Sequence, residues 1–203
     1  MMKVLYISYT KPGTGARIHT AEFFSAFRAI HKEAMIYPSI TRRAHRRGHQ
    51  FPSKAEEKVK ALQGTRMLGS MFTKKLFSEA KVLLYYKPNV LIVRPGHYFS
   101  GLLLSRLLKI PCILEINGPV SELRLAKRRM GSLSLWQWLE KFVLLRLPNH
   151  ITVVSETLRR YYIDRGIPGR KMTTVPNGVD VKRFSPDIDG GKVRKKFRLK
   201  GKT

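Results

Sequence analysis

The stretch from Ile151 to Pro186 constrains the fold of this chain more than any other segment. It reads ITVVSETLRRYYIDRGIPGRKMTTVPNGVDVKRFSP. The β-branched run at its start predicts a buried parallel strand. Ser155 and Gly166 are suited to begin and end the helix that follows. Residues 172–176 predict a second strand, and Asn177-Gly178 predicts a tight turn, because both residues tolerate a positive φ.

Apolar runs and helical patterns alternate over the rest of the chain. Strands are predicted at 3–8, 33–38, 90–94 and 112–117, and helices at 17–31, 54–87, 98–109 and 121–147. In the first helix, Phe23, Phe24, Phe27 and Ile30 are expected on one face. Strands of continuous apolar character separated by helices indicate an α/β, Rossmann-like three-layer domain with a mainly parallel sheet. Ligands of such sheets bind beyond the carboxyl ends of the strands.

Positive charge is the unusual feature of the composition. Lys and Arg number 40 against 13 acidic residues, which leaves a formal net charge of +27. Such a surface attracts anions, so we expect an anionic partner. The charge gathers in a C-terminal tail from Lys192 to Lys202 and in two further runs, which contain Arg42, Arg43, Arg46 and Arg47, and Arg124, Lys127, Arg128 and Arg129.

Several classes of protein are not supported by the sequence. The single cysteine, Cys112, lies in an apolar strand and is expected to be a core residue, so neither a disulfide framework nor a metal-ligand cluster is predicted. The N-terminus enters a strand directly and lacks the pattern of a secretion signal. No apolar run has the length of a membrane span. These features favour a cytoplasmic location.

The loop after the first strand, SYTKPGTGARIH at 8–19, is a candidate for binding phosphate. Gly13 and Gly15 allow close approach of a ligand to the backbone, and the following helix N-terminus attracts anions. Ala16, Arg17 and His19 complete this loop. A dinucleotide fingerprint is weakly supported, because Ile18 stands where its third glycine belongs and no acidic residue ends the second strand.

The wording of the Ile151–Pro186 segment resembles the end of the N-terminal domain of family 4 glycosyltransferases, which have the two-domain GT-B fold. A strand ending in serine, a helix, G-x-P, a strand and P-N-G-V-D-x-x-x-F-x-P occur there in this order. The resemblance implies that 1–186 is the Rossmann-like acceptor-side domain. Residues 187–203 would be a basic linker and the start of a donor-binding domain that this sequence lacks.

The same resemblance implies site residues. A histidine near His97 lies beside the reacting sugar in related enzymes, and the 8–19 loop contacts acceptor and donor diphosphate. The loop at 114–123 holds Glu115, which is expected to act as a base or hydrogen-bond acceptor, or to pair with an arginine. Asn117 and Gly118 are expected to shape an acceptor pocket. Asn177, Gly178 and Asp180 are expected near the cleft between the two domains.

The reaction implied by the resemblance is transfer of a sugar from a nucleotide sugar to a glycan or lipid-linked acceptor, with retained anomeric configuration. No metal ion or other cofactor is expected. The glutamate pair and basic pair of the donor-binding domain do not occur, so this chain is expected to be inactive without that domain or a partner chain. The basic runs and the 54–87 helix, with Met67, Met71 and Phe72, are expected to bind the inner face of the plasma membrane peripherally.

Two other interpretations remain open. A basic nucleic-acid- or anion-binding module agrees with the charge. It lacks a helix-turn-helix, zinc or RNA-recognition signature, so a nucleic-acid partner is not favoured. A non-catalytic α/β subunit that needs a partner chain is the second alternative.

Overall fold

Six parallel strands form the centre of the domain. The structure is a computed structural model that describes residues 2–10, 15–38, 71–94, 100–119, 145–178, 181, 185 and 189–197. Every strand pair is parallel, in the order β2-β1-β3-β4-β5-β6. The strands are β1 (Val4–Ser8), β2 (Ala34–Tyr37), β3 (Val90–Arg94), β4 (Cys112–Ile116), β5 (His150–Val153) and β6 (Met172–Thr174). The predicted α/β fold with a mainly parallel sheet is confirmed.

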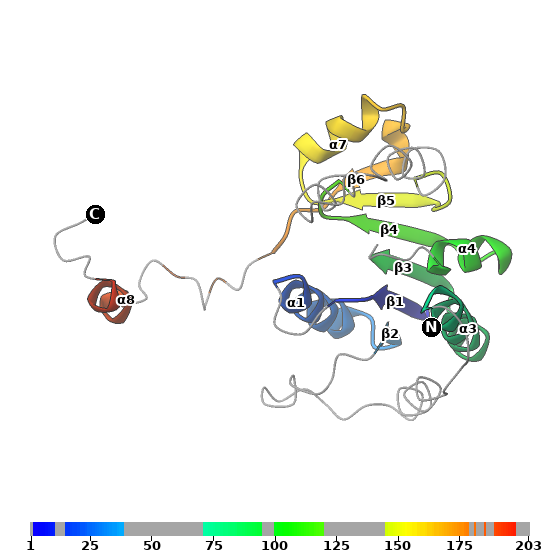
Figure 1. The fold of residues 1–203 in the computed structure, drawn as a ribbon, viewed down its shortest axis with the longest axis horizontal. Coiled ribbons are helices and arrows are strands. Elements are labelled where there is room, and N and C mark those ends of the chain that lie inside the picture. The colour runs from blue at the N-terminus through cyan, green and yellow to red at the C-terminus, as the bar shows by residue number, and fades with distance from the viewer. Residues whose placement is uncertain are drawn as a thin grey trace.

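Within the described part of the chain, helices pack in two cores against the sheet, and Figure 1 labels each helix. They are α1 (Gly15–Ile30), α3 (Met71–Tyr86), α4 (Ser100–Leu107), α7 (Glu156–Ile163) and α8 (Gly191–Lys196), with a 3₁₀ turn η4 (Gly169–Lys171). The connection from β1 to β2 through α1 runs one way across the sheet, and the connections after β2 run the other way. Because parallel crossovers are right-handed, α1 lies on one face of the sheet and α3, α4 and α7 lie on the other. Helix α8 lies apart from the sheet in Figure 1.

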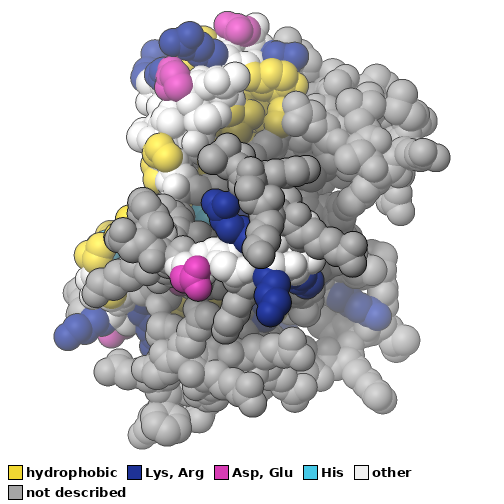
Figure 2. Space-filling view, turned by 90° about the vertical axis from the view of Figure 1, so that its left-hand side faces the viewer, with side chains coloured by type: hydrophobic (Ala, Val, Ile, Leu, Met, Phe, Trp, Pro, Cys, Tyr) yellow, Lys and Arg dark blue, Asp and Glu magenta, His cyan; other side chains and the backbone are white. Residues whose placement is uncertain are grey.

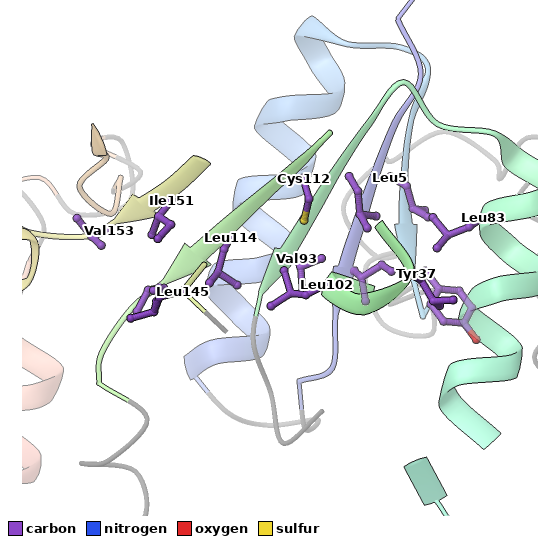
Figure 3. Packing of buried hydrophobic residues seen from close by; sticks show 14 of the residues in the cluster. Leu5, Tyr37, Leu83, Val93, Leu102, Cys112, Leu114, Leu145, Ile151 and Val153 are labelled. Atoms are coloured by element: carbon purple, nitrogen blue, oxygen red, sulfur yellow. The ribbon is translucent and has the colours of Figure 1, made fainter. Parts of the chain in front are cut away.

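The larger core lies between the sheet and the α3–α4–α7 layer (Figure 3). Leu5, Val93 and Leu114 from the strands meet Leu83 of α3 and Leu102 of α4. Cys112 is a buried free cysteine in this core, as predicted. A smaller core lies under α1, where Phe24 packs with Tyr6 and neighbouring apolar residues of β1, β2 and β3. Burial on both faces explains why these strands are continuously apolar.

Both ends of helix α7 form as the sequence predicts. The Ser155 side chain accepts a hydrogen bond from the backbone N–H of Leu158 (3.2 Å) and caps the N-terminus. Gly166 has a φ of 86° after the last turn, which is the left-handed conformation that glycine adopts most readily. Glu156 lies in the first turn and accepts from Thr174 (2.9 Å), so the start of α7 is joined to the end of β6.

Three predictions about local structure are wrong. Helix α1 begins at Gly15, so Gly15 and Ala16 belong to its first turn and not to the loop, a shift of the size expected at helix ends. Ile30 is 78 % exposed, because His31 rather than Ile30 packs on Phe27, with ring centroids 4.6 Å apart. The helix predicted at 121–147 does not extend to 147, because residues 145–147 already form turns and a bend.

Candidate functional site

A row of polar side chains crosses the face of the sheet that carries α1. The strand register pairs Ser8 with Arg94, Glu115 with Thr152, and Thr152 with Thr173. Arg94 ends β3, and its ion pair with Glu115 joins the two halves of the row. Because parallel strands end at the same edge, one polar residue near the carboxyl end of each of these strands falls in line. The row begins beneath α1, where the hydroxyls of Ser8 and Thr20 lie 3.2 Å apart.

Glu115 is the centre of this row, and both of its carboxylate oxygens have partners. Oε2 accepts from the Tyr6 hydroxyl at 2.7 Å. Oε1 accepts from Nη1 of Arg94 at 3.0 Å and lies 3.2 Å from Nε2 of His19. With its amide turned to satisfy both atoms, Asn117 donates to Oε1 (3.3 Å) and accepts from Arg94. Residues separated by up to 109 positions therefore meet at one carboxylate.

The cluster is mostly shielded from water. The Glu115 and Arg94 side chains are 11 % and 12 % exposed, whereas His19 is 23 % exposed. Burial, and then the Glu115 carboxylate, raise the pKa of the Tyr6 hydroxyl, so this phenol stays protonated and donates. A charge-assisted network of this kind restricts the orientation of each member. The arrangement holds a guanidinium and an imidazole in fixed positions near the carboxyl-terminal edge of the sheet.

The structure brings together some of the predicted site residues. His19, Glu115 and Asn117 are in direct contact, and Gly118 follows Asn117 at the same edge. Arg17 lies two residues before His19 in α1, and burial lowers the pKa of its guanidinium. Asn177 and Gly178 are exposed beyond β6, and neither is among the described partners of Glu115. His97, Gly13, Asp180 and the runs containing Arg42, Arg43, Arg46, Arg47, Arg124, Lys127, Arg128 and Arg129 lie outside the described residues.

Two members of the cluster, Tyr6 and Arg94, were not predicted. Both occur inside apolar strand patterns, VLYIS and VLIVR. The signal that could have found Arg94 is its position at the last residue of a strand, where a parallel sheet exposes side chains to ligands. Tyr6 could only be found from the pairing of β1, β3 and β4, since it lies one row below Ser8 on the same face.

Glycine positions at this edge leave room for a ligand. A Cβ added at Gly15 or at Gly118 would have no described atom within 4 Å. By contrast, a Cβ at Gly101 would lie 3.3 Å from Val93 and 3.4 Å from Ile7, so that glycine is required by packing. Among the described residues, no atom therefore fills the space beside Gly15 and Gly118.

Figure 2 looks onto the carboxyl-terminal edge, toward which the strand arrows of Figure 1 point. Side chains of Lys, Arg, Asp and Glu are visible on this side of the molecule, with a small area of histidine. Within the described ranges, no group of three or more His, Cys, Asp or Glu side chains is placed to hold a metal ion. The Arg94 guanidinium and the His19 imidazole at this edge are suited to an anionic or polar ligand.

A second polar cluster lies on the opposite face, within the larger core. Glu79 of α3 is 1 % exposed. Among the described residues its Oε2, the Tyr9 hydroxyl and the Ser100 hydroxyl are buried without hydrogen-bond partners. Tyr9 and Ser100 are near enough to lower the pKa of Glu79, but burial is the stronger effect and raises it. The Nζ of Lys75 lies 4.0 Å from the centre of the Tyr9 ring.

Glu79→Gln is expected to stabilise the domain at neutral pH and to have little effect at acidic pH. The raised pKa means that folding favours the protonated carboxyl, so its contribution to stability is full below the ordinary pKa and is lost as pH rises through the raised value. Glutamine keeps the shape without the charge, and the gain should be about 1 kcal/mol. Urea denaturation at both pH values measures it, with exposed Glu33→Gln as the control. An equal difference at both pH values contradicts this explanation.

Comparison with models of protein families shows which family the chain belongs to. The model of Glycosyltransferase Family 4 matches residues 14–183, which is well over half of the 203 residues. The domain is an α/β layer structure of the Rossmann type with a polar carboxyl-terminal edge. The chain belongs to glycosyltransferase family 4. No curated protein sequence matches the chain at a significant level.

Solved structures confirm the fold. A glycosyltransferase from Rickettsia africae is 13% identical, with a TM-score of 0.58 over 100% of this chain and 51% of that one. Anabaena Alr3699/HepE in complex with UDP-glucose is 12% identical, with a TM-score of 0.59 over 99% and 51%. The UDP-N-acetylglucosamine 2-epimerase of Rickettsia bellii is 17% identical, with a TM-score of 0.56 over 98% and 51%. The chain thus has the fold of one half of a GT-B structure and spans about half the length of these proteins.

Proposed function

We propose that this chain is the acceptor-binding half of a retaining glycosyltransferase that uses a nucleotide sugar as donor. The observation that carries the proposal is the family match over residues 14–183 together with a length that covers half of each similar structure. In this arrangement a second domain or partner chain supplies most of the donor site, and the acceptor lies against the carboxyl-terminal edge of the sheet.

Glu115 serves, in this proposal, to position its neighbours rather than to accept a proton from substrate. Its two oxygens are already occupied by Tyr6, Arg94 and His19, so it has little capacity left for a reacting hydroxyl. His19 is more exposed than Arg94 and Tyr6. It can contact the acceptor hydroxyl or the donor diphosphate while Glu115 holds its ring, and Arg94 can offset negative charge that develops on the leaving group.

The remaining site residues keep the roles implied by the sequence. Gly13, Gly15, Ala16 and Arg17 form the phosphate and acceptor segment, and His97 lies beside the reacting sugar. Asn117 and Gly118 shape the acceptor pocket, and Asn177, Gly178 and Asp180 face the second domain. No metal ion or other cofactor takes part in this proposal.

The acceptor in this proposal is a glycan or a lipid-linked sugar, and the protein binds the inner face of the plasma membrane peripherally. The charge of +27 supports it, because basic residues near an anionic leaflet each contribute about 1 kcal/mol. Among the described residues, no helix combines the length and apolar character needed to cross a bilayer. The basic runs at 42–47 and 124–129 are part of this surface in the proposal.

Residues 1–203 alone are expected to transfer no sugar, because they span about half of each similar structure and the other half supplies most of the donor site in this proposal. The measurement is an assay of the purified chain with a set of nucleotide sugars and a glycolipid mixture, followed by mass spectrometry of the products. A chimera that joins the chain to the donor-binding half of a family 4 enzyme serves as the positive arm. Robust transfer by the chain alone would contradict the proposal.

A nucleic-acid-binding module without catalysis is the second candidate, and the charge of +27 is the observation that favours it. Binding of the chain to duplex DNA and to anionic vesicles at increasing salt ranks the two anionic partners. Tighter and less salt-sensitive binding to DNA would favour this alternative.

A further inference from the structure

The last residues of β1 and β3 have one side in the candidate site and the other in the larger core. Ser8 pairs with Arg94, and the preceding residues Ile7 and Val93 also pair with each other. Successive residues of a strand point to opposite faces of a sheet. Arg94 lies on the α1 side, where it binds Glu115, whereas Ile7 and Val93 belong to the larger core (Figure 3). A contact that holds the core side of these strand ends therefore also restricts the position of Arg94.

Helix α4 packs closely against these strand ends, and Glu79 of α3 lies beside the contact. A Cβ added at Gly101, the second residue of α4, would lie 3.3 Å from Val93 and 3.6 Å from Oε2 of Glu79. Because Gly101 has no side chain, the first turn of α4 can approach both β3 and the Glu79 carboxylate. Glu79 is 1 % exposed. Its carboxylate therefore meets the start of α4 in the interior of the domain.

Two hydroxyl groups from the carboxyl-terminal edge lie near the same carboxylate. Tyr9 directly follows β1, and Ser100 is the first residue of α4. Burial raises the pKa of Glu79, and the hydroxyls of Ser100 and Tyr9 oppose this rise. The Tyr9 ring is held by two further contacts, since its centroid lies 6.2 Å from that of Tyr37 and 4.0 Å from Nζ of Lys75. One carboxylate thus lies between the residue that follows β1 and the residue that begins α4.

This cluster costs stability, so packing alone does not account for it. Oε2 of Glu79 and the hydroxyls of Tyr9 and Ser100 are buried, and none has a hydrogen-bond partner among the described residues. Buried polar groups without hydrogen bonds destabilise a fold, and an apolar side chain of similar shape would avoid the cost of the Glu79 carboxylate. Destabilising groups of this kind concentrate at functional sites. The position of the cluster behind β1 and β3 indicates the candidate site at the ends of these strands.

We propose that Glu79 is a positioning residue for the transfer reaction, because through Tyr9 and Ser100 it holds the ends of β1 and β3 and, with them, the Arg94 guanidinium. Small adjustments of the two hydroxyls complete hydrogen bonds to the carboxylate, as catalytic hydrogen bonds often tighten when substrate binds. Arg94 is then held from the core side by this cluster and from the site side by Glu115. The inference rests on the proposed function, in which Arg94 offsets charge that develops during transfer.

The charges around Glu79 argue against a cation-binding role for this cluster. Lys75 lies near enough for the two charges to affect each other's pKa. The N-terminal turn of α4 adds a partial positive charge beside the carboxylate. A bound cation would be repelled by both. The Glu79 carboxylate is therefore better suited to accept hydrogen bonds from the neighbouring hydroxyls.

The first test measures backbone hydrogen exchange of residues 1–203 by NMR. Glu79→Met keeps the length of the side chain and removes its polar atoms. It should raise exchange about tenfold near the ends of β1 and β3 and in α4, while β5 and α7 exchange as before. Glu33→Met is the control, because Glu33 is exposed and precedes β2 at the opposite edge of the sheet. Unchanged exchange at the strand ends of the Glu79→Met variant would overturn the proposal.

The second test measures sugar transfer by the chimera that contains a donor-binding half. Glu79→Met should lower kcat about thirtyfold and change KM for the nucleotide sugar less than about threefold, because Arg94 acts on charge in the transition state. Glu79→Gln keeps an acceptor oxygen and a similar shape, so its kcat should stay within about threefold of the unmodified enzyme. The midpoint of thermal unfolding shows that each variant is folded at the assay temperature. Full kcat in a folded Glu79→Met variant would contradict the positioning role.

A double-mutant cycle tests whether Glu79 acts through its two hydroxyl neighbours. Tyr9→Phe and Ser100→Ala should each lower kcat about threefold or more, and neither should lower it further in the Glu79→Met background. Ser105→Ala should leave kcat unchanged, because the buried Ser105 hydroxyl donates to the Leu102 carbonyl at 2.7 Å in the same helix. Strictly additive losses would refute the link. An unmodified chimera without transfer activity would contradict the proposed function, whereas hydrogen exchange would still decide whether Glu79 holds the strand ends.

Discussion

Glu115→Ala is expected to lower the free energy of unfolding by about 3 kcal/mol or more, as removal of one partner from a buried ion pair does. The change leaves the Arg94 guanidinium, which is 12 % exposed, without its carboxylate. It also leaves the Tyr6 hydroxyl, in a residue that is 1 % exposed, without its acceptor. Urea denaturation of the purified chain, followed by circular dichroism, measures the effect. Glu115→Gln should cost less, because its amide oxygen can still accept one hydrogen bond.

A double-mutant cycle separates this ion pair from general packing at the same position. Arg94→Leu removes the charge that Glu115→Ala leaves unpaired, so the double variant should be destabilised by clearly less than the sum of the two single variants. A coupling energy on the order of 1 kcal/mol or more is expected. Strictly additive losses would show that the Glu115–Arg94 contact contributes nothing specific, and Glu115 would then lose its proposed positioning role.

Gly15→Val and Gly118→Val are expected to lower kcat/KM of the assembled enzyme about a hundredfold each, which is the loss typical of a displaced substrate. A Cβ at either glycine has no described atom within 4 Å, so the fold should accept the side chain. Neither glycine has a positive φ, so backbone strain does not oppose the change. The added methyl groups would instead occupy space that the proposed ligand needs.

Two measurements make this prediction specific. The midpoint of thermal unfolding should be unchanged in both variants, whereas kcat/KM falls. Gly190→Val is the control, because a Cβ there meets only Arg194, at 4.0 Å, in the segment before α8. Unchanged kcat/KM in the Gly15 and Gly118 variants would place the ligand elsewhere along the edge. A fall in the unfolding midpoint would mean that the loss of activity reflects folding.

Much of the fold could be predicted because local patterns and tertiary packing agree. The apolar runs of β1, β3 and β4 are buried on both faces, and their ends match the prediction within a residue. The caps of α7 depend only on the chemistry of Ser155 and Gly166, which acts within a few residues. Ile30 was misplaced because helical periodicity identifies a face but does not say which residue, Ile30 or His31, reaches the neighbouring ring.

The candidate site was only partly predictable, because local patterns do not show which residues meet in the folded chain. Glu115, Asn117 and His19 could be selected because they lie near the end of a strand or near the start of a helix, which are local properties. Arg94 has the same local signal, as the last residue of β3, but its partner Glu115 depends on which strands are neighbours, and Tyr6 has no local signal at all. The order β2-β1-β3-β4 brings three strands and α1 to a single carboxylate. The family's roles for His97 and Asp180 remain predictions, as both lie outside the described residues.

The Ile151–Pro186 segment and the strand–helix alternation by themselves determined the α/β class and the family, because period, capping and turn chemistry are properties of adjacent residues. Tertiary structure alone decided that Glu115 is shared by Tyr6, Arg94 and His19, and that Glu79 lies behind the ends of β1 and β3. The physical reason is that strand order and register are set by long-range burial. No short window of sequence contains the partners that meet there.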